Sequence, residues 1–356
     1  MDDSAHDQRQ SIVETIFPDG IPQLWCPLLT HYRDTGGSLD PQRVRAHLRY
    51  LAPVVKTFLA PGSTGDGWEM SPQRQDELIA LLLELSAELD LKLMIGVLRS
   101  GRGEARDAIV AKTAELLGEG HSWELGTIAA ELNALRVSGF TVTPPKGSAL
   151  TQSQIYSELA AVGELGVPVA FYQLPQITEN EMAPETVAEL AARYPGFYML
   201  KDTSGADRVA MAAHEHDYQG LFLVRGAERD YAAWHRRAGG PYDGFLLSTV
   251  NCFAHPLAEI LTALREGCHE TARSISVRIS AVAEELFSAA AELPFGNPFS
   301  NANRAIDHVF AYGEQEALTR EPPATISGNR LPHALIERAA QALQREGFDT
   351  RTGYLE

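Results

Sequence analysis

The sequence predicts an α/β protein, a (β/α)8 TIM barrel followed by a C-terminal helical extension. Eight short apolar runs alternate with longer segments of helical spacing along most of the 356 residues. Such alternation favours a parallel sheet, because each crossover between parallel strands needs a helix, and eight units close into a barrel of about 250 residues. Hydrophobic residues make up 44% of the chain, which is enough for a large core.

The expected strands are apolar runs that end near glycine, proline or polar residues. They lie at 23–29, 57–61, 92–98, 140–143, 167–171, 197–200, 221–225 and 244–248. Helical segments separate them, and two of these carry clear start signals. Ser71 precedes Pro72 as an N-cap before a proline at the first helical position, and Thr151 with Gln154 forms a capping-box pattern. The other barrel helices are expected at 41–51, 105–117, 184–194, 207–214, 229–237 and 255–265.

Two features fall outside the eightfold repeat. Segment 118–136 lengthens the connection between the third and fourth strands, where we expect an extra helical turn or a lid. After Gly267 the pattern is helical at 270–291, 301–312 and 332–345. We therefore predict a barrel over 12–267 that carries the active site, and a helical extension over 268–356.

Lys201 lies where an apolar run meets the turn Ser204-Gly205. A lysine at the end of a buried strand loses hydration in its charged form, which favours the neutral amine. A neutral amine can attack a ketone and form a Schiff base. The structural alternative is a lysine whose stem packs on the sheet while its ammonium group reaches water. For Lys201 taken alone, this second interpretation is the favoured one.

Two other strand ends supply groups that suit the same chemistry. Tyr172 follows the expected fifth strand and brings a phenol to a strand terminus. After the second strand, the loop Gly62-Ser63-Thr64-Gly65 offers two hydroxyls and a flexible backbone whose N–H groups can face an anion. The carboxyl ends of barrel strands share one rim, so an amine, a phenol and a carboxylate cradle are predicted to converge there. These are the parts that carbinolamine chemistry on a 2-oxo acid requires.

Charge and cysteine content restrict the partners. The net charge of −17 leaves no basic stripe for nucleic-acid phosphates. Three scattered cysteines form neither a disulfide framework nor a structural zinc motif, and no histidine–carboxylate spacing is diagnostic of a catalytic metal. The polar N-terminus is unlike a signal peptide, and no long apolar span is present. We expect a cytoplasmic protein that binds a small molecule, without nucleic acid, membrane or metal.

Three motifs, taken in order, resemble the dihydrodipicolinate synthase and N-acetylneuraminate lyase family. They are Gly62-Ser63-Thr64-Gly65-Asp66, Tyr172-Gln173-Leu174-Pro175 and Leu200-Lys201-Asp202-Thr203-Ser204-Gly205, and the resemblance extends to the run that ends at Ser248. It implies a class I, Schiff-base-forming aldolase that is usually a homotetramer, or otherwise a dimer, and needs no cofactor beyond the imine. Carried over by position, it makes Lys201 the imine-forming lysine and Tyr172 the proton-transfer phenol. The implied substrate-binding residues are Gly62, Ser63, Thr64, Gly226 and Ser248.

The chain departs from the synthase pattern in the half of the site that would hold the second substrate. Ile177 stands where the synthase has an arginine that grips a carboxylate, and segment 143–147 lacks the synthase's tyrosine after the fourth strand. Gln173 replaces an asparagine, and Trp68 adds a large aromatic ring near the cradle. Ile177 and Trp68 suit an apolar or aromatic substrate end, whereas Lys146 suits a distal anion. All four residues are candidates for setting specificity.

We predict a lyase that cleaves or condenses a pyruvate-type 2-oxo acid with an aldehyde. One alternative is dehydration of a hydroxylated 2-oxo acid through the same imine, in which the imine acidifies C3 and a hydroxyl leaves. The other is a barrel that binds an oxo acid without catalysis, because function does not follow from fold. Product analysis separates the first two, and turnover across a panel of 2-oxo acids tests the third.

Overall fold

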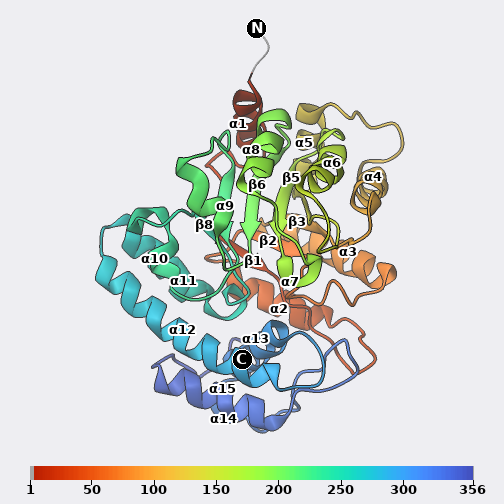
Figure 1. Cartoon of the computed structure of the whole chain (residues 1–356). Helices are drawn as coiled ribbons and strands as arrows, with labels where there is room; N and C mark the ends of the chain where they lie inside the picture. The colour runs from red at the N-terminus through yellow and green to blue at the C-terminus, as the bar shows by residue number, and fades with distance from the viewer. Residues whose placement is uncertain (1–3, 356) are drawn as a thin grey trace. The chain divides into compact units, whose positions relative to one another are not determined.

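The computed structural model describes residues 4–355 and shows the predicted barrel (Figure 1). Eight strands follow one another in chain order as neighbours in a closed barrel, and the pair β1–β2 and the successive pairs from β3–β4 to β7–β8 are parallel. The strands are β1 (Leu24–Pro27), β2 (Thr57–Ala60), β3 (Lys92–Val97), β4 (Val137–Val142), β5 (Val169–Gln173), β6 (Phe197–Asp202), β7 (Phe222–Arg225) and β8 (Gly244–Leu246). The fold class predicted from the alternating pattern is confirmed.

Most helices occupy the segments in which helical spacing was expected. Those between strands are α2 (Pro41–Leu51), α3 (Pro72–Leu89), α4 (Glu104–Leu117), α5 (Leu125–Ala134), α6 (Gln152–Gly163), α7 (Pro175–Thr178), α8 (Pro184–Arg193), α9 (Arg208–Met211) and α10 (Tyr231–Trp234). Those after β8 are α11 (Val250–Arg265), α12 (His269–Ala291), α13 (Pro298–Tyr312), α14 (Glu314–Ala317) and α15 (His333–Arg345). Helices α7 and α14 lie outside the segments in which helical spacing was expected. Ser71 caps α3, and Thr151 with Gln154 forms the predicted capping box of α6. None of the helices in residues 4–355 combines the length and apolar character that crossing a bilayer requires.

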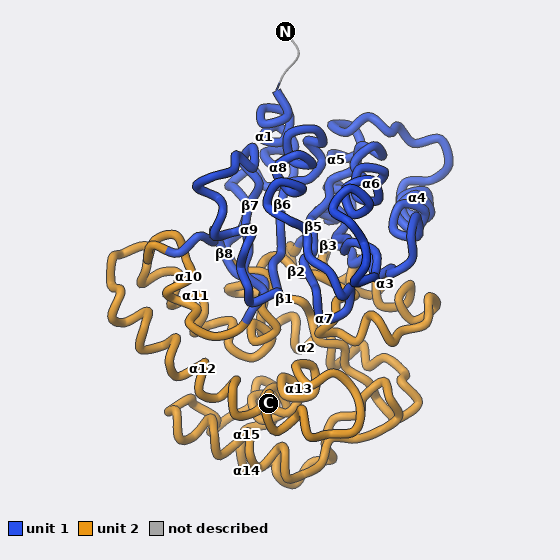
Figure 2. The backbone as a smooth tube through the Cα atoms, viewed as in Figure 1, with its two compact units in different colours: residues 1–23, 92–227, 240–246 blue, residues 24–91, 228–239, 247–356 orange. Residues whose placement is uncertain are grey.

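The chain divides into two compact units, coloured separately in Figure 2. The first comprises residues 1–23, 92–227 and 240–246, and it contains strands β3 to β8. The second comprises residues 24–91, 228–239 and 247–356, and it contains β1, β2 and the C-terminal helices. The predicted boundary after residue 267 stays a prediction.

Strand β4 begins three residues earlier than its apolar pattern indicated. Ser138 and Gly139 interrupt that pattern, yet both lie inside the strand. Gly139 has φ of +124°, and a Cβ at this position would lie 2.3 Å from the carbonyl oxygen of Pro168. The glycine is therefore required by the close approach of the neighbouring backbone, and it does not mark the strand's end.

Segment 118–136 contains helix α5, so the prediction of extra helical structure there is confirmed. Glu124 starts the helix, and its carboxylate accepts hydrogen bonds from the backbone N–H groups of Gly126 and Thr127. Sequence analysis had not identified this residue as a cap, because glutamate is less common at that position than serine, threonine or aspartate. The movement of a lid is not tested by this geometry.

Helix α1 (Ala5–Ile16), which precedes the first strand, was missed by the sequence analysis. Its polar sequence gives only a narrow apolar face, but Arg9 is fully buried. The Arg9 guanidinium donates to the carbonyl oxygens of Phe197 and Ala191 at 2.5 Å, and to that of Tyr194 at 3.1 Å. Burial lowers the pKa of Arg9 to about 10, so the side chain stays charged at neutral pH. The helix is thus attached to the first unit by charge-assisted hydrogen bonds that join residues far apart in sequence.

Arg9→Met is therefore expected to destabilise the protein, because it leaves buried carbonyl oxygens without donors. We expect a loss of about 2–4 kcal/mol in the free energy of unfolding, measured by urea denaturation. The matched control is Arg106→Met, which removes an arginine that is about half exposed and paired with its neighbour Asp107. The control should change stability by no more than about 0.5 kcal/mol. Equal stability of the two variants would contradict an anchoring role for Arg9.

Candidate active site

Lys201 and Tyr172 lie side by side at the ends of β6 and β5. The two residues are register partners, and the Lys201 Nζ lies 4.1 Å from the centroid of the Tyr172 ring. Lys201 is 4% exposed and Tyr172 is 2% exposed. Both are among the last two residues of their strands, whereas Tyr172 had been predicted to follow its strand. The first unit therefore brings together the amine and the phenol that the sequence singled out.

Gly226 follows β7 and makes room for Lys201. A Cβ at this position would lie 2.4 Å from Cγ2 of Thr203 and 3.1 Å from Cε of Lys201. The Gly226 N–H donates to the carbonyl oxygen of Asp202 at 2.6 Å, which fixes the backbone at that distance. A side chain here would displace the lysine stem, so the structure gives Gly226 a steric role toward Lys201 in addition to the predicted role toward substrate.

A buried polar network lies directly behind Lys201, and sequence analysis had not identified it. Asp202 is fully buried, which raises its pKa, and its Oδ1 accepts a hydrogen bond from the Ser204 N–H at 2.8 Å. Asp207 accepts from the Tyr242 hydroxyl at 2.6 Å and from Arg225 Nε at 3.3 Å. Asp207, which directly precedes α9, thereby links β7 to the segment before β8. The partners lie far apart in the sequence, so the network can be recognised only in the folded structure.

Thr143 is a further polar residue at a strand end. Thr141 on β4 pairs with Ala170, which in turn pairs with Met199. Because side chains alternate along a strand, the residues two positions further on share one face, and these are Thr143, Tyr172 and Lys201. The Thr143 hydroxyl is buried without a hydrogen-bond partner among residues 4–355. It is thus available to a polar atom of a bound molecule.

The specificity candidates near β5 differ in how their side chains are used. Gln173 is buried, and its amide donates to the carbonyl of Met182 at 3.2 Å while accepting from the N–H of the same residue at 2.9 Å. Its polar groups therefore hold the turn after β5. Lys146 is half exposed and lies 3.0 Å from the Glu179 carboxylate. Ile177 lies on the short helix α7, partly exposed and without any charge to offer.

The loop 62–67 belongs to the second unit. The hydroxyl of Ser63 accepts a hydrogen bond from the indole N–H of Trp68 at 2.9 Å. The carbonyl oxygen of Thr64 accepts from the Ser300 hydroxyl of α13 at 2.7 Å. Gly62 accepts from the N–H groups of Gly65 and Gly67, so the loop is a tight turn. Trp68 is confirmed as a neighbour of the predicted cradle, and it orients the Ser63 side chain.

Ser248 is bound to other residues of the second unit. Its hydroxyl donates to the carboxylate of Glu228 at 2.6 Å and accepts from Asn303 at 3.0 Å. Glu228 also accepts from the hydroxyls of Thr249 and Tyr231, at 2.8 and 3.0 Å. Burial raises the pKa of Glu228, while these hydrogen bonds oppose the shift. Sequence analysis missed Glu228, because an isolated glutamate two residues after Gly226 carries no motif.

The predicted site residues thus fall into two groups. The first unit holds Lys201, Tyr172, Gln173, Gly226, Ile177 and Lys146, and the second unit holds Gly62, Ser63, Thr64, Trp68 and Ser248. Within the first group, Lys201 is in contact range of Tyr172 and Gly226. Within the second, Ser63 and Trp68 are bonded to each other. The convergence of both groups on one substrate stays a prediction.

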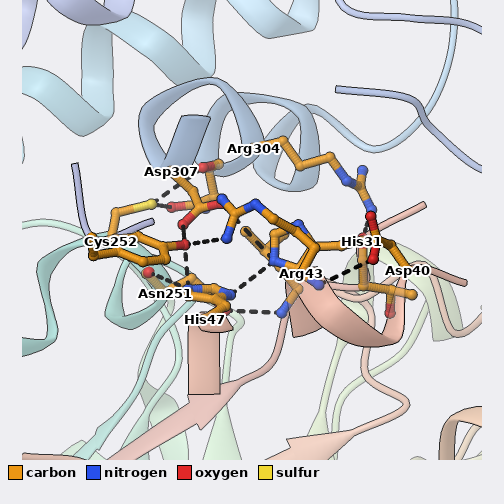
Figure 3. Close-up of polar contacts among 12 residues, drawn as sticks. His31, Asp40, Arg43, His47, Asn251, Cys252, Arg304 and Asp307 are labelled. Atoms are coloured by element: carbon orange, nitrogen blue, oxygen red, sulfur yellow. Dashed lines mark hydrogen bonds and ion pairs between the residues drawn. The ribbon is translucent and has the colours of Figure 1, made fainter. Parts of the chain in front are cut away.

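One cluster of side chains has the composition of a metal site. His31, His47 and Asp307 are buried close together in the second unit, as Figure 3 shows. However, the ring nitrogens of the two histidines are hydrogen-bonded to each other at 2.9 Å, and the other nitrogen of His47 lies 2.8 Å from the Asn251 carbonyl oxygen. Arg43 donates to Asp307 at 2.5 Å, which brings a positive charge to the carboxylate. These contacts favour a hydrogen-bonded polar core over a cation site.

Comparison with known proteins shows what this chain is similar to. Residues 127–298 match the model of the Dihydrodipicolinate synthetase family. A 4-hydroxy-tetrahydrodipicolinate synthase of Methanospirillum hungatei is 21% identical over 280 residues, covering 78% of this chain and 87% of the relative. A synthase of the same name from an Exiguobacterium species is 26% identical over 245 residues, covering 67% and 74%.

Solved structures show the same fold. The dihydrodipicolinate synthase of Thermotoga maritima superposes with a TM-score of 0.69 at 17% identity, covering 91% of this chain and 97% of that protein. A variant of the Sulfolobus solfataricus 2-keto-3-deoxygluconate aldolase gives a TM-score of 0.69 at 12% identity, covering 91% and 96%. The family match spans the strands that carry Lys201, Tyr172 and Gly226. The chain is therefore similar to the dihydrodipicolinate synthetase family over residues 127–298, and the likeness to synthases and aldolases indicates an enzyme of the lyase class.

Proposed function

We propose that this protein is a Schiff-base-forming aldolase that cleaves a 4-hydroxy-2-oxo acid into pyruvate and an aldehyde, or catalyses the reverse condensation. The observation that carries the proposal is the buried pair at the ends of β5 and β6, where the Lys201 amine lies over the Tyr172 ring. A lysine amine held at a strand end beside a phenol can attack a ketone and form a Schiff base. Relatives named as synthases and an aldolase support the same class of reaction.

The lysine supplies the covalent step. Lys201 Nζ attacks the C2 carbonyl, a C–N bond forms, and the carbonyl oxygen leaves as water to give a protonated imine. In cleavage, the C4 hydroxyl loses its proton, the C3–C4 bond breaks, and its electron pair moves into the imine to form an enamine. Protonation of the enamine at C3 and hydrolysis of the imine release pyruvate and restore the amine. The imine is the electron sink, so the reaction needs no metal or organic cofactor.

Tyr172 is the proposed proton carrier in this sequence. Its ring lies against the Lys201 amine, so the phenol can give its proton to the oxygen that leaves C2, and the resulting phenolate can take the C4 hydroxyl proton and return it in condensation. Thr143, on the face of β4 continuous with this pair, has a buried hydroxyl that can hold a substrate oxygen. Thr143 would thereby make a polar contact in the segment where this chain lacks the tyrosine of the synthase.

The two ends of the substrate are proposed to meet different surroundings. Ser63 and Thr64 are the candidates for holding the 2-oxo acid carboxylate, because their loop is fixed by Trp68 and Ser300 and retains the family motif. At the other end, Ile177 can offer no ion pair to a carboxylate, and Lys146 is already paired with Glu179. An uncharged aldehyde is therefore the preferred partner. We propose cytoplasmic location and assembly into a homo-oligomer on the strength of the family relationship alone.

Product analysis tests the proposal. With pyruvate and a panel of aldehydes, we expect condensation with neutral aldehydes and little with aspartate semialdehyde, whose carboxylate would lie unpaired near Ile177. Lys201→Ala should fold, because it removes a buried amine without adding bulk, and should lose turnover by several orders of magnitude. Products are identified by mass spectrometry.

Three outcomes would count against this assignment. Efficient condensation of pyruvate with aspartate semialdehyde would show that the chain has the synthase activity for which its relatives are named. Loss of water from a hydroxylated 2-oxo acid with the carbon skeleton intact would identify a dehydratase. Binding of 2-oxo acids without any product would favour a non-catalytic barrel.

Tyr172→Phe separates proton transfer from packing. The substitution keeps the ring that faces Lys201, so imine formation and stability should change little. Removal of the hydroxyl should slow carbon–carbon cleavage by roughly 10²–10⁴-fold, measured as kcat. Tyr218→Phe is the matched control, since this buried tyrosine of the first unit bonds only a backbone carbonyl, that of Val209, at 2.8 Å. Unchanged turnover with a lowered Tm would assign Tyr172 to the core instead.

A further inference from the structure

The second unit contains a cavity that no part of the proposed reaction uses. Its volume is about 230 Å³, and it is bordered by the N-terminal end of α2, by α13 and by the segment 320–324. Arginine is the commonest residue in its lining, with five side chains: Arg33, Arg43, Arg304, Arg320 and Arg330. Three carboxylates line it as well: Asp40, Asp307 and Glu321. In a chain with a net charge of −17, this concentration of guanidinium groups is unusual.

The carboxylates of the lining already have partners. Asp307 accepts from Arg43 at 2.5 Å and from the Tyr354 hydroxyl at 2.6 Å (Figure 3). Asp40 caps α2 by accepting from the backbone N–H of Arg43 at 3.0 Å. Glu321 lies 2.7 Å from Arg330. Their negative charges are therefore engaged at the cavity wall.

Donors remain after these contacts are made. The Arg33 side chain is exposed and has no hydrogen bond or ion pair within residues 4–355. Arg304 is 2% exposed, and its Nε has no hydrogen-bond partner in the same part of the chain. Its Nη2 holds Asp66 and the carbonyl oxygen of Thr30. A buried N–H without an acceptor costs free energy, which a ligand oxygen would recover.

The buried guanidinium groups are held in place before any ligand arrives. Arg43 lies over the Tyr354 ring, with its Cζ 5.1 Å from the centroid, and Arg304 lies over Tyr32 at 5.5 Å. Such fixed donors pay little ordering entropy on binding. His31 adds no charge at neutral pH, because burial and the nearby Arg43 hold its pKa well below the ordinary value. The positively charged side chains of the lining are therefore its arginines, of which Arg320 is itself paired with Glu316, as Arg43 is with Asp307.

We propose that this cavity binds a small dianion, either a phosphate group or a short dicarboxylate. The planar guanidinium fork matches the oxygen atoms of both groups, and Arg33 with the Arg304 Nε–H supplies donors that the carboxylates of the wall do not use. The volume of about 230 Å³ is several times the roughly 30 Å³ of one water molecule, so the cavity has room for such an anion. The site is separate from the residues assigned to the reaction, and its existence does not depend on the proposed function.

Isothermal titration calorimetry with inorganic phosphate and with succinate tests the site. Neither compound has a ketone, so neither can form an imine with Lys201, and acetate at equal ionic strength serves as the monoanion control. We expect saturable binding of at least one dianion, one site per chain, and no saturable binding of acetate. Binding of phosphate alone identifies a phosphate site, and binding of succinate alone identifies a dicarboxylate site.

Variants then locate the binding. Arg33→Gln leaves the buried ion pairs intact. It should lower the affinity for the dianion by about tenfold, because one charge-assisted hydrogen bond is lost. Arg33→Lys should retain more of the affinity than Arg33→Gln. The control is Arg106→Gln, an exposed arginine of the first unit, which should bind like the unmodified protein. Absence of saturable binding by either dianion, or equal affinity in Arg33→Gln and the unmodified protein, would overturn the proposal.

Discussion

The proposed chemistry depends on keeping one lysine buried at the end of a strand with space around its amine. Three neighbouring strands meet this constraint together. Tyr172 on β5 gives Lys201 an aromatic face, and Gly226 after β7 leaves out the Cβ that would collide with the lysine stem. Thr203 donates its hydroxyl to the carbonyl of Gln173 at 2.6 Å, which ties the end of β6 to that of β5. These contacts hold a lysine that is 4% exposed in one place beside the Tyr172 ring.

In the second unit, the positions of the loop 62–67 and of helix α13 likewise depend on buried charged groups. Helix α13 contacts the loop 62–67 twice, through Arg304 to Asp66 and through Ser300 to the carbonyl of Thr64. The same helix contributes Arg304 and Asp307 to the arginine-rich cavity. A buried ion pair recovers its desolvation cost only when its geometry is well satisfied, so the loop and the helix constrain each other's positions. Occupation of the cavity would act on Arg304, and through it on the loop that carries the proposed carboxylate ligands.

Local patterns predicted the strands and most helices because each carries its own signal. Lys201 and Tyr172 could be found because polar groups stand out at the ends of apolar strands, and strand order in a barrel then makes them neighbours. Helix α1 was missed because its buried face depends on Arg9, whose acceptors lie more than 180 residues away. The contacts of Glu228 with Ser248, of Arg304 with Asp66 and of His31 with His47 also join separate segments. No local periodicity encodes such pairs, so only the folded chain reveals them.

The central claim is that Lys201 forms an imine with a 2-oxo acid, and reductive trapping tests it most directly. The protein is incubated with pyruvate and borohydride, digested, and its peptides are analysed by mass spectrometry. The account predicts a reduced pyruvate adduct on the peptide that contains Lys201, dependent on pyruvate and absent from Lys201→Ala. An active protein without any adduct, or with an adduct confined to another lysine, would contradict it.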